Sequence, residues 1–181
     1  MVNIISKEIE ISELKKIVIQ MKPSNLNSFI NNRIEKGKIN TNIEIYLSNT
    51  QKIENYIIKG EVKDMVIKLD TDLRLSKTNF NFFADQSDIL IKNIKSKSEG
   101  VSIDNGSLKI EKGEDISLKA DLNTKIDIKK DSKLKFLPLL RKINIINNET
   151  TLNGKLDHFL NLTFDRTFKV TDFSYKNKGN V

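Results

Sequence analysis

The chain has 181 residues, of which 38% are apolar, 30% charged and 7% aromatic, a length that fits one domain or a large piece of one. Its lack of Cys excludes disulfides, thiolate metal sites and thiol nucleophiles, and its seven Gly and two Pro exclude collagen-like or linker sequences. The net charge of +7 rests on scattered Lys rather than Arg, with few aromatics, so the composition argues against a nucleic-acid surface.

The first third of the chain carries the helical signals. Ser12 is a candidate N-cap, Pro23 and Ser24 separate two elements, and Gly37 follows the second as a C′ residue. Both elements have apolar residues at helical spacing. These are Leu14, Ile17, Val18 and Met21 in the first, and Leu26, Phe29, Ile30 and Ile34 in the second. The pattern predicts a helical hairpin over about residues 12–36.

After Gly37 the apolar period changes from 3.6 to 2, which is typical of strands with one dry face and one wet face. The alternation predicts about ten to twelve short strands over about residues 38–176, arranged as an antiparallel meander. Turn signals between them are Ser98-Glu99-Gly100, Asp104-Asn105-Gly106, Lys112-Gly113-Glu114-Asp115 and Asn147-Asn148. A further alternating run is predicted from Ile67 to Ser76.

Three glycines begin similar strands. Apolar residues follow Gly37 and Gly154 at the same offsets of two, six, eight and ten residues. The pattern after Gly60 begins alike and then slips by one residue before Ile67, which predicts a β-bulge in that strand.

A meander with one aliphatic face must bury that face against something. A closed two-layer sandwich, a helical cover and a curled open sheet are the available solutions. Two short helices are too small to cover ten strands, and few Gly and Pro are present for corner turns, which favours a mainly β, open, taco-like groove with the helical hairpin packed on it. The candidate groove-lining residues are Ile43, Ile45, Leu47, Ile67, Leu69, Leu73, Leu75, Ile89, Ile91, Leu108, Ile110, Ile116, Leu118, Leu122, Leu160, Leu162 and Phe164.

The sequence offers little for catalysis. His158 is the only imidazole, and parity places it on the face of Leu156 and Leu160, where a partly buried or edge histidine is the simplest interpretation. No metalloprotease, nucleophile-elbow, phosphate-loop or calcium-loop motif occurs. We therefore expect no catalytic residues, no metal and no cofactor, and a protein that is not an enzyme.

Three stretches together resemble the AsmA-like superfamily, specifically the central domain of YhdP-type proteins. The first is LKKIVIQMKPSNLNSFINNRIEKGKINTNIEIYL over Leu14–Leu47, with Phe29 where that family prefers Trp. The second is the alternating strands through Asn105–Ile110, and the third combines Leu137-Pro138-Leu139-Leu140 with Asn153-Gly154-Lys155-Leu156 and the strand Leu160–Phe164.

The resemblance implies an inner-membrane-anchored β-groove protein that crosses the periplasm of a Gram-negative bacterium. Such proteins are associated with moving phospholipid towards the outer membrane and with the barrier function of that membrane. The family's anchoring helix is absent here, so the resemblance implies an internal fragment in which Met1 need not be the true start. The expected partners are phospholipid acyl chains, membranes through segments outside this chain, and flanking groove segments of the parent protein; nucleic acid is not expected.

One alternative of a different class stays open. The chain could be a non-catalytic structural or interaction module, whose apolar face packs on another domain or subunit without lipid.

Overall fold

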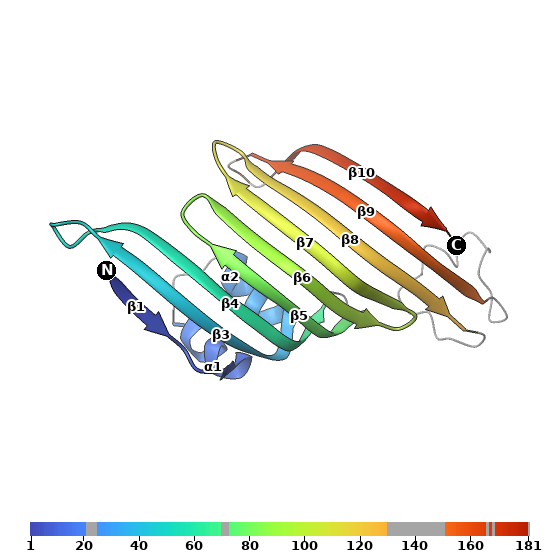
Figure 1. The fold of residues 1–181 in the computed structure, drawn as a ribbon, viewed down its shortest axis with the longest axis horizontal. Helices are drawn as coiled ribbons and strands as arrows, with labels where there is room; N and C mark the ends of the chain where they lie inside the picture. Colours follow the sequence, from blue (N-terminus) through green and yellow to red (C-terminus); the bar gives the residue numbers. More distant parts are fainter. Residues whose placement is uncertain (21–24, 70–72, 130–150, 166, 168, 181) are drawn as a thin grey trace.

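The computed structural model describes residues 1–20, 25–69, 73–129, 151–165, 167 and 169–180, and shows a mainly β protein. One antiparallel sheet of ten strands carries two short helices on one of its faces (Figure 1). This confirms the predicted mainly β fold, its antiparallel meander and its helical pair. The strands are β1 (Val2–Ile5), β2 (Ile9–Glu10), β3 (Ile34–Leu47), β4 (Ile53–Lys68), β5 (Arg74–Ala84), β6 (Asp88–Ser98), β7 (Val101–Lys112), β8 (Ile116–Ile128), β9 (Leu152–Phe164) and β10 (Val170–Asn180).

The sheet is a meander from β3 onward. Its strand order is β1-β3-β4-β5-β6-β7-β8-β9-β10, with β2 pairing on β3 beside β1. Each strand from β3 to β10 therefore pairs with its neighbours in sequence, and every pair is antiparallel. Strands β1 and β10 form opposite edges of the sheet, so the sheet is open (Figure 1).

The first helix, α1 (Ile11–Val18), begins one residue earlier than predicted. Its N-cap is Glu10, which makes no side-chain capping hydrogen bond, and the predicted cap Ser12 lies inside the first turn. The buried residues of the helix are Ile11 and Val18, whereas Ile17 is 59% exposed. The buried stripe of the helix is therefore rotated from the predicted one. The rotation arises because β2 leads directly into α1, so the first helical residue, Ile11, is buried against the sheet.

The second helix, α2 (Asn25–Arg33), ends before the predicted boundary. Strand β3 begins at Ile34, which pairs with Ile67 on β4, so sheet pairing replaces the last predicted helical turn. Gly37 is thus not a helix C′ residue but a position within β3, with a φ of 147°. A Cβ there would lie 2.8 Å from the Cα of Met65, so glycine permits close approach of the two strands.

The compact core lies where the helices cover the sheet. Ile11, Ile34, Val62 and Met65 form a buried cluster, so one helix and two strands contribute to it. Burying an aliphatic side chain of this size contributes roughly 1.5–3 kcal/mol. Figure 1 shows both helices behind β3 to β5, which leaves the β6–β10 half of the sheet without a helix against it among the described residues.

Three neighbouring strands contain bulges at residues with a left-handed backbone. Asp64 on β4, Lys77 on β5 and Asn93 on β6 have φ values of 49°, 50° and 57°. The pairing register shifts beside each of them, which confirms the bulge predicted after Gly60. An extra residue in one strand disrupts the ladder locally and increases the twist of that strand.

The predicted turns had mixed outcomes. Those at 98–100 and 112–115 connect β6 to β7 and β7 to β8, as expected, whereas Asn147-Asn148 lies outside the described residues. The segment Asp104-Asn105-Gly106 is not a turn but lies within β7, because a register shift there lets β7 stay paired with β8. The alternating run from Ile67 to Ser76 is interrupted, since β4 ends at Lys68 and β5 begins at Arg74.

Candidate functional site

One register line across the sheet consists only of apolar residues. Its members oppose one another in successive pairs from β1 to β10, so they lie on the same face of nine strands. We call this line the first apolar row. It consists of Ile4, Ile43, Ile58, Ala84, Ile89, Ile110, Leu118, Leu162 and Phe173.

A second line runs beside it on the same face, two residues along each strand and nearer to the helices. We call this line the second apolar row. It consists of Thr41, Gly60, Phe82, Ile91, Leu108, Ala120, Leu160 and Tyr175. Neither row contains a charged side chain. Gly60 leaves room for the neighbouring aromatic ring, since a Cβ there would lie 2.8 Å from Cζ of Phe82.

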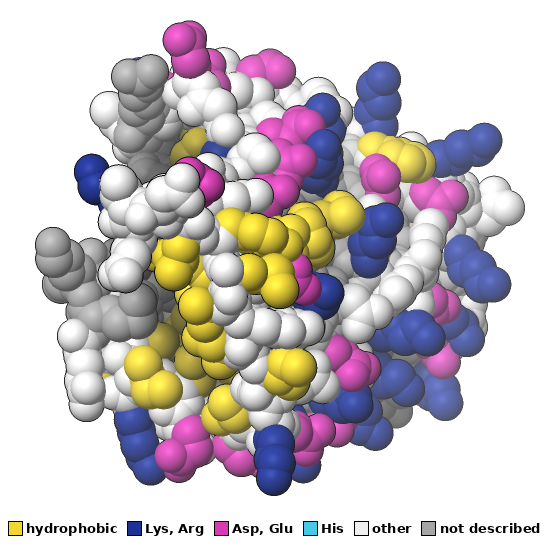
Figure 2. Space-filling view, turned by 60° about the vertical axis from the view of Figure 1, so that its left-hand side comes forward, with side chains coloured by type: hydrophobic (Ala, Val, Ile, Leu, Met, Phe, Trp, Pro, Cys, Tyr) yellow, Lys and Arg dark blue, Asp and Glu magenta, His cyan; other side chains and the backbone are white. Residues whose placement is uncertain are grey.

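The apolar rows are only partly covered. The helices contact β2, β3 and β4 alone among the described strands, so the rows leave the helical cover as they cross β6 to β10. The two ends of the first row are the most open, with Ile4 49% and Phe173 60% exposed. Most inner members are partly exposed, and Ala120 is buried. Viewed towards the β1 side, hydrophobic side chains form a continuous patch with charged side chains around it (Figure 2).

Most predicted lining residues lie on this face. Eight belong to the two rows, and four more extend the same face beside them. The eight are Ile43, Ile89, Ile110, Leu118 and Leu162 in the first row, and Ile91, Leu108 and Leu160 in the second. The four are Ile45, Ile116, Leu122 and Phe164. Ile45 lies opposite Tyr56, Ile116 lies opposite Phe164, and Leu122 lies opposite His158.

The other predicted lining residues occupy less regular positions. Leu47 lies opposite Ile53 at the end of β3 and is 38% exposed. Ile67 packs against the buried cluster under the helices and pairs with Leu75. Leu69 and Leu73 lie outside the strands, in the β4–β5 connection, where the Leu69 N–H donates to the Leu73 carbonyl at 2.9 Å.

Sequence reasoning missed several members of the rows. Ile58, Phe82, Ala84, Ala120 and Phe173 complete the lines across β4, β5, β8 and β10. The sequence shows the alternation that places Phe82, Ala120 and Phe173 on one face of their strands. It does not show the register that aligns these residues with residues on other strands.

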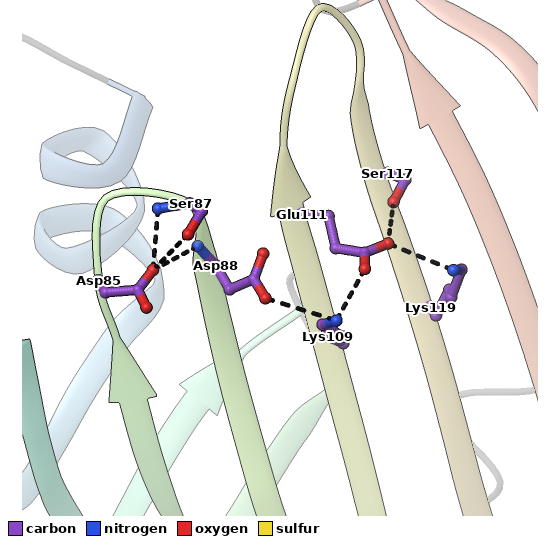
Figure 3. Close-up of polar contacts among 7 residues, drawn as sticks. All are labelled: Asp85, Ser87, Asp88, Lys109, Glu111, Ser117 and Lys119. Atoms are coloured by element: carbon purple, nitrogen blue, oxygen red, sulfur yellow. Dashed lines mark hydrogen bonds and ion pairs between the residues drawn. The ribbon is translucent and has the colours of Figure 1, made fainter.

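The opposite face carries the charged side chains. Near the ends of β6, β7 and β8, the Lys109 Nζ lies 2.7 Å from a Glu111 carboxylate oxygen and 3.4 Å from one of Asp88 (Figure 3). Glu111 also accepts hydrogen bonds from the Ser117 hydroxyl at 3.0 Å and from Lys119 at 3.2 Å. The hydrogen bond from Lys109, followed by those from Ser117 and Lys119, lowers the pKa of Glu111 to about 2.

A second, nearby carboxylate is used in a turn. Asp85 accepts hydrogen bonds from the backbone N–H groups of Ser87 and Asp88, both at 2.8 Å, and from the Ser87 hydroxyl (Figure 3). The backbone hydrogen bond from Asp88 is the largest cause that holds the pKa of Asp85 below its ordinary value. These contacts close the β5–β6 connection.

The apolar face has one hydrogen-bonded polar cluster near the β10 edge. The His158 Nε2 lies 2.8 Å from the Thr124 hydroxyl, and its Nδ1 lies 2.6 Å from the Tyr175 hydroxyl. The imidazole also stacks on the tyrosine ring, with centroids 6.0 Å apart. A hydroxyl can donate or accept, so either neutral tautomer of His158 is satisfied. The cluster places hydrogen-bonding groups beside the end of the second row without placing a carboxylate or an amine there.

The arrangement separates two chemistries on one sheet. One face presents two uncharged and mostly apolar rows, which favour contact with apolar matter, and the other presents ion pairs to water. With strands about 4.8 Å apart, nine strands carry the first row over roughly 38 Å. The hydrocarbon core of a bilayer, which is two acyl chains thick, is about 30 Å, so the row is longer than two chains end to end.

The described residues contain neither a membrane-spanning helix nor a candidate metal site. Neither helix is long and apolar enough to cross a membrane. No group of three or more His, Asp or Glu side chains within the described part of the chain is arranged to hold a metal ion.

Comparisons with protein-family models, with curated proteins and with solved structures found no match to this chain.

Proposed function

We propose that this chain is a segment of a conduit that carries phospholipid along the apolar face of its sheet. The observation that carries the proposal is the first apolar row, which crosses nine strands without a charged residue. Acyl chains need a continuous apolar surface, because each CH₂ moved out of water contributes about 0.8 kcal/mol. A row longer than two acyl chains supplies such a surface, while the polar face keeps the sheet in contact with water.

The proposal extends to the setting of the protein. The resemblance to YhdP-type AsmA-like proteins supports a periplasmic location, tethering to the inner membrane through a helix outside this chain, and transport towards the outer membrane. In that setting, flanking groove segments of the parent protein continue the track. Loss of the parent gene is expected to weaken the outer-membrane barrier and to sensitise cells to detergent. Unchanged detergent sensitivity, or a cytoplasmic location by fractionation, would contradict this part of the proposal.

The direct test measures bound lipid in the wild-type protein and in a variant with a charge in the first apolar row. Protein purified without detergent is expected to carry phospholipid, measured by mass spectrometry after solvent extraction. Leu162→Asp puts a carboxylate in the first row at β9, where it can still reach water when lipid is absent. We expect the variant to remain folded, with a lowered melting temperature, and to lose most of its lipid.

The matched control is Asn161→Asp, one residue away on the polar face and opposite Lys119. This variant adds the same charge and is expected to keep both its lipid and its melting temperature. A lipid-free, stable monomer would contradict the conduit and favour a structural module that packs its apolar face on another domain. If Leu162→Asp keeps its full lipid load, β9 is not part of the lipid track.

A further inference from the structure

His158 lies inside the apolar face, on the inner strand β9. Leu156 and Leu160 flank it on the same face of that strand, and Leu122 lies opposite it on β8. Its other cross-strand neighbour is Asn177 on β10. Since β9 is paired on both sides, the place of His158 in the sheet does not depend on what lies beyond β10. A titratable side chain is thus set among residues that the proposed lipid would cover.

The strands around His158 bring no charged side chain to its face. On β8, Leu122 and Thr124 lie nearest to it on that face, and on β10, Tyr175 and Asn177 do. The phenol of Tyr175 is the one titratable group among these four. The charged residues beside them alternate onto the opposite, polar face, and they are Asp121, Lys125, Asp157, Lys176 and Lys178.

The hydrogen bonds of His158 can persist when the imidazole gains a proton. Its Nε2 and Nδ1 lie 2.8 Å and 2.6 Å from the hydroxyls of Thr124 and Tyr175. A neutral imidazole has one donor and one acceptor nitrogen, whereas an imidazolium has two donors. Because a hydroxyl oxygen can accept as well as donate, both partners can accept from the imidazolium. Protonation therefore adds a positive charge to the apolar face without breaking the cluster.

We propose that His158 makes lipid binding sensitive to pH, because its protonated form weakens the binding of acyl chains to this part of the face. The inference rests on the proposed function, since the charge matters only where apolar matter covers it. Taking a charge out of water costs free energy unless an opposite charge accompanies it, and the three strands supply none on this face. Bound lipid and a bound proton therefore oppose each other. Histidine ordinarily changes its charge between pH 5 and 8, so the affinity for lipid should fall as the pH is lowered through that range.

The test measures the affinity of lipid-stripped protein for phosphatidylcholine that carries a fluorophore on one acyl chain. Binding is titrated at pH 8 and at pH 5 with the ionic strength held constant. This zwitterionic probe keeps the same net charge at both pH values, and His158 is the sole histidine of the chain. We expect the dissociation constant of the wild-type protein to rise roughly 3- to 30-fold at pH 5.

Two variants assign the effect to the charge of residue 158. His158→Gln cannot be protonated in this range but still donates and accepts hydrogen bonds, so it should bind the probe equally at both pH values, with about the wild-type affinity at pH 8. His158→Arg is positively charged throughout and should bind weakly at both. Circular dichroism and melting temperatures at each pH separate a loss of lipid binding from a loss of fold.

The outcomes separate this inference from the conduit itself. Equal wild-type affinity at pH 8 and pH 5 would overturn the inference and leave the conduit standing. The same pH dependence in His158→Gln would also overturn it, because the titrating group would then lie elsewhere. Tighter binding at pH 5 would contradict the expected sign and indicate contact of the imidazolium with the lipid phosphate. Absence of binding at both pH values would overturn the conduit and this inference with it.

Discussion

At the scale of single residues, Glu111 ties together β7 and β8 on the polar face. Its carboxylate accepts hydrogen bonds from Lys109, Ser117 and Lys119, and these lower its pKa to about 2 from an ordinary value of 4.5. A lowered pKa means that the folded protein binds fewer protons than the unfolded chain between those two values. The stabilisation is therefore complete above about pH 4.5 and disappears as the pH falls through about 2.

The corresponding prediction concerns Glu111→Gln. The variant should have a lower urea midpoint than the wild-type protein at pH 7, and the difference should shrink progressively as the pH falls from 4.5 towards 2. Equilibrium urea unfolding at several pH values measures it. Glu99→Gln, in the exposed β6–β7 turn, is the control and should follow the wild-type curve. A Glu111→Gln difference that stays constant with pH would show that these hydrogen bonds do not stabilise the fold.

His158 shows how far sequence reasoning reaches at this scale. Parity along β9 places it on the apolar face, where the structure also has it. Its hydrogen-bond partners Thr124 and Tyr175 are 34 and 17 residues away in the chain. These contacts depend on the register of three strands, which alternation along a single strand does not contain.

At the scale of elements, α1 is held by a different stripe from the predicted one. Ile11, the first residue of α1, is 2% exposed and belongs to the buried cluster, whereas Ile17 is 59% exposed. Ile11→Ala should cost about 2–4 kcal/mol through lost burial and the cavity it leaves. Ile17→Ala should change the free energy of unfolding by less than about 0.5 kcal/mol. Equal losses in chemical denaturation would contradict this orientation of α1.

The strands were more predictable than their boundaries and registers. Alternation after Gly37 correctly predicts the meander, because each strand has one dry and one wet face. It does not predict that Ile34 joins β3 rather than α2, since pairing with Ile67 overrides local helical spacing. Nor does it predict the bulges at Lys77 and Asn93, which shift the pairing of β5 with β6. Bulges decide which residues meet across strands, so the apolar rows emerge only from the assembled sheet.

At the scale of the whole molecule, the solvent-accessible surface is large for the mass of the chain. The chain has a mass of 20.8 kDa and a solvent-accessible surface of 12648 Å². A compact monomer of this mass is expected to expose about 8,900 Å². Only eight apolar residues are buried among those described. Most apolar residues in the described part of the chain are thus at least partly exposed to solvent.

This surface predicts a small heat-capacity change on unfolding. A compact protein of 181 residues should show about 2.2–2.7 kcal/mol/K, because unfolding newly exposes its apolar core. The lipid-stripped protein should fall clearly below this range in differential scanning calorimetry, since its apolar rows are already partly in water. The comparison is lipid-loaded protein, which releases its lipid as it unfolds. It should show a larger heat-capacity change on unfolding. A lipid-stripped value within the compact range would contradict an open apolar face.

The meander also determines how such a surface can change in length. From β4 to β10 each strand pairs, among the described strands, only with its neighbours in sequence, so no connection in this part of the sheet has to cross another strand. Duplication of one hairpin therefore inserts two strands without rethreading the rest, and lengthens both rows by about 10 Å. The length of the apolar rows is then set by the number of hairpins. Evolution can change this length in steps of two strands, while the part of the sheet under the helices stays unchanged.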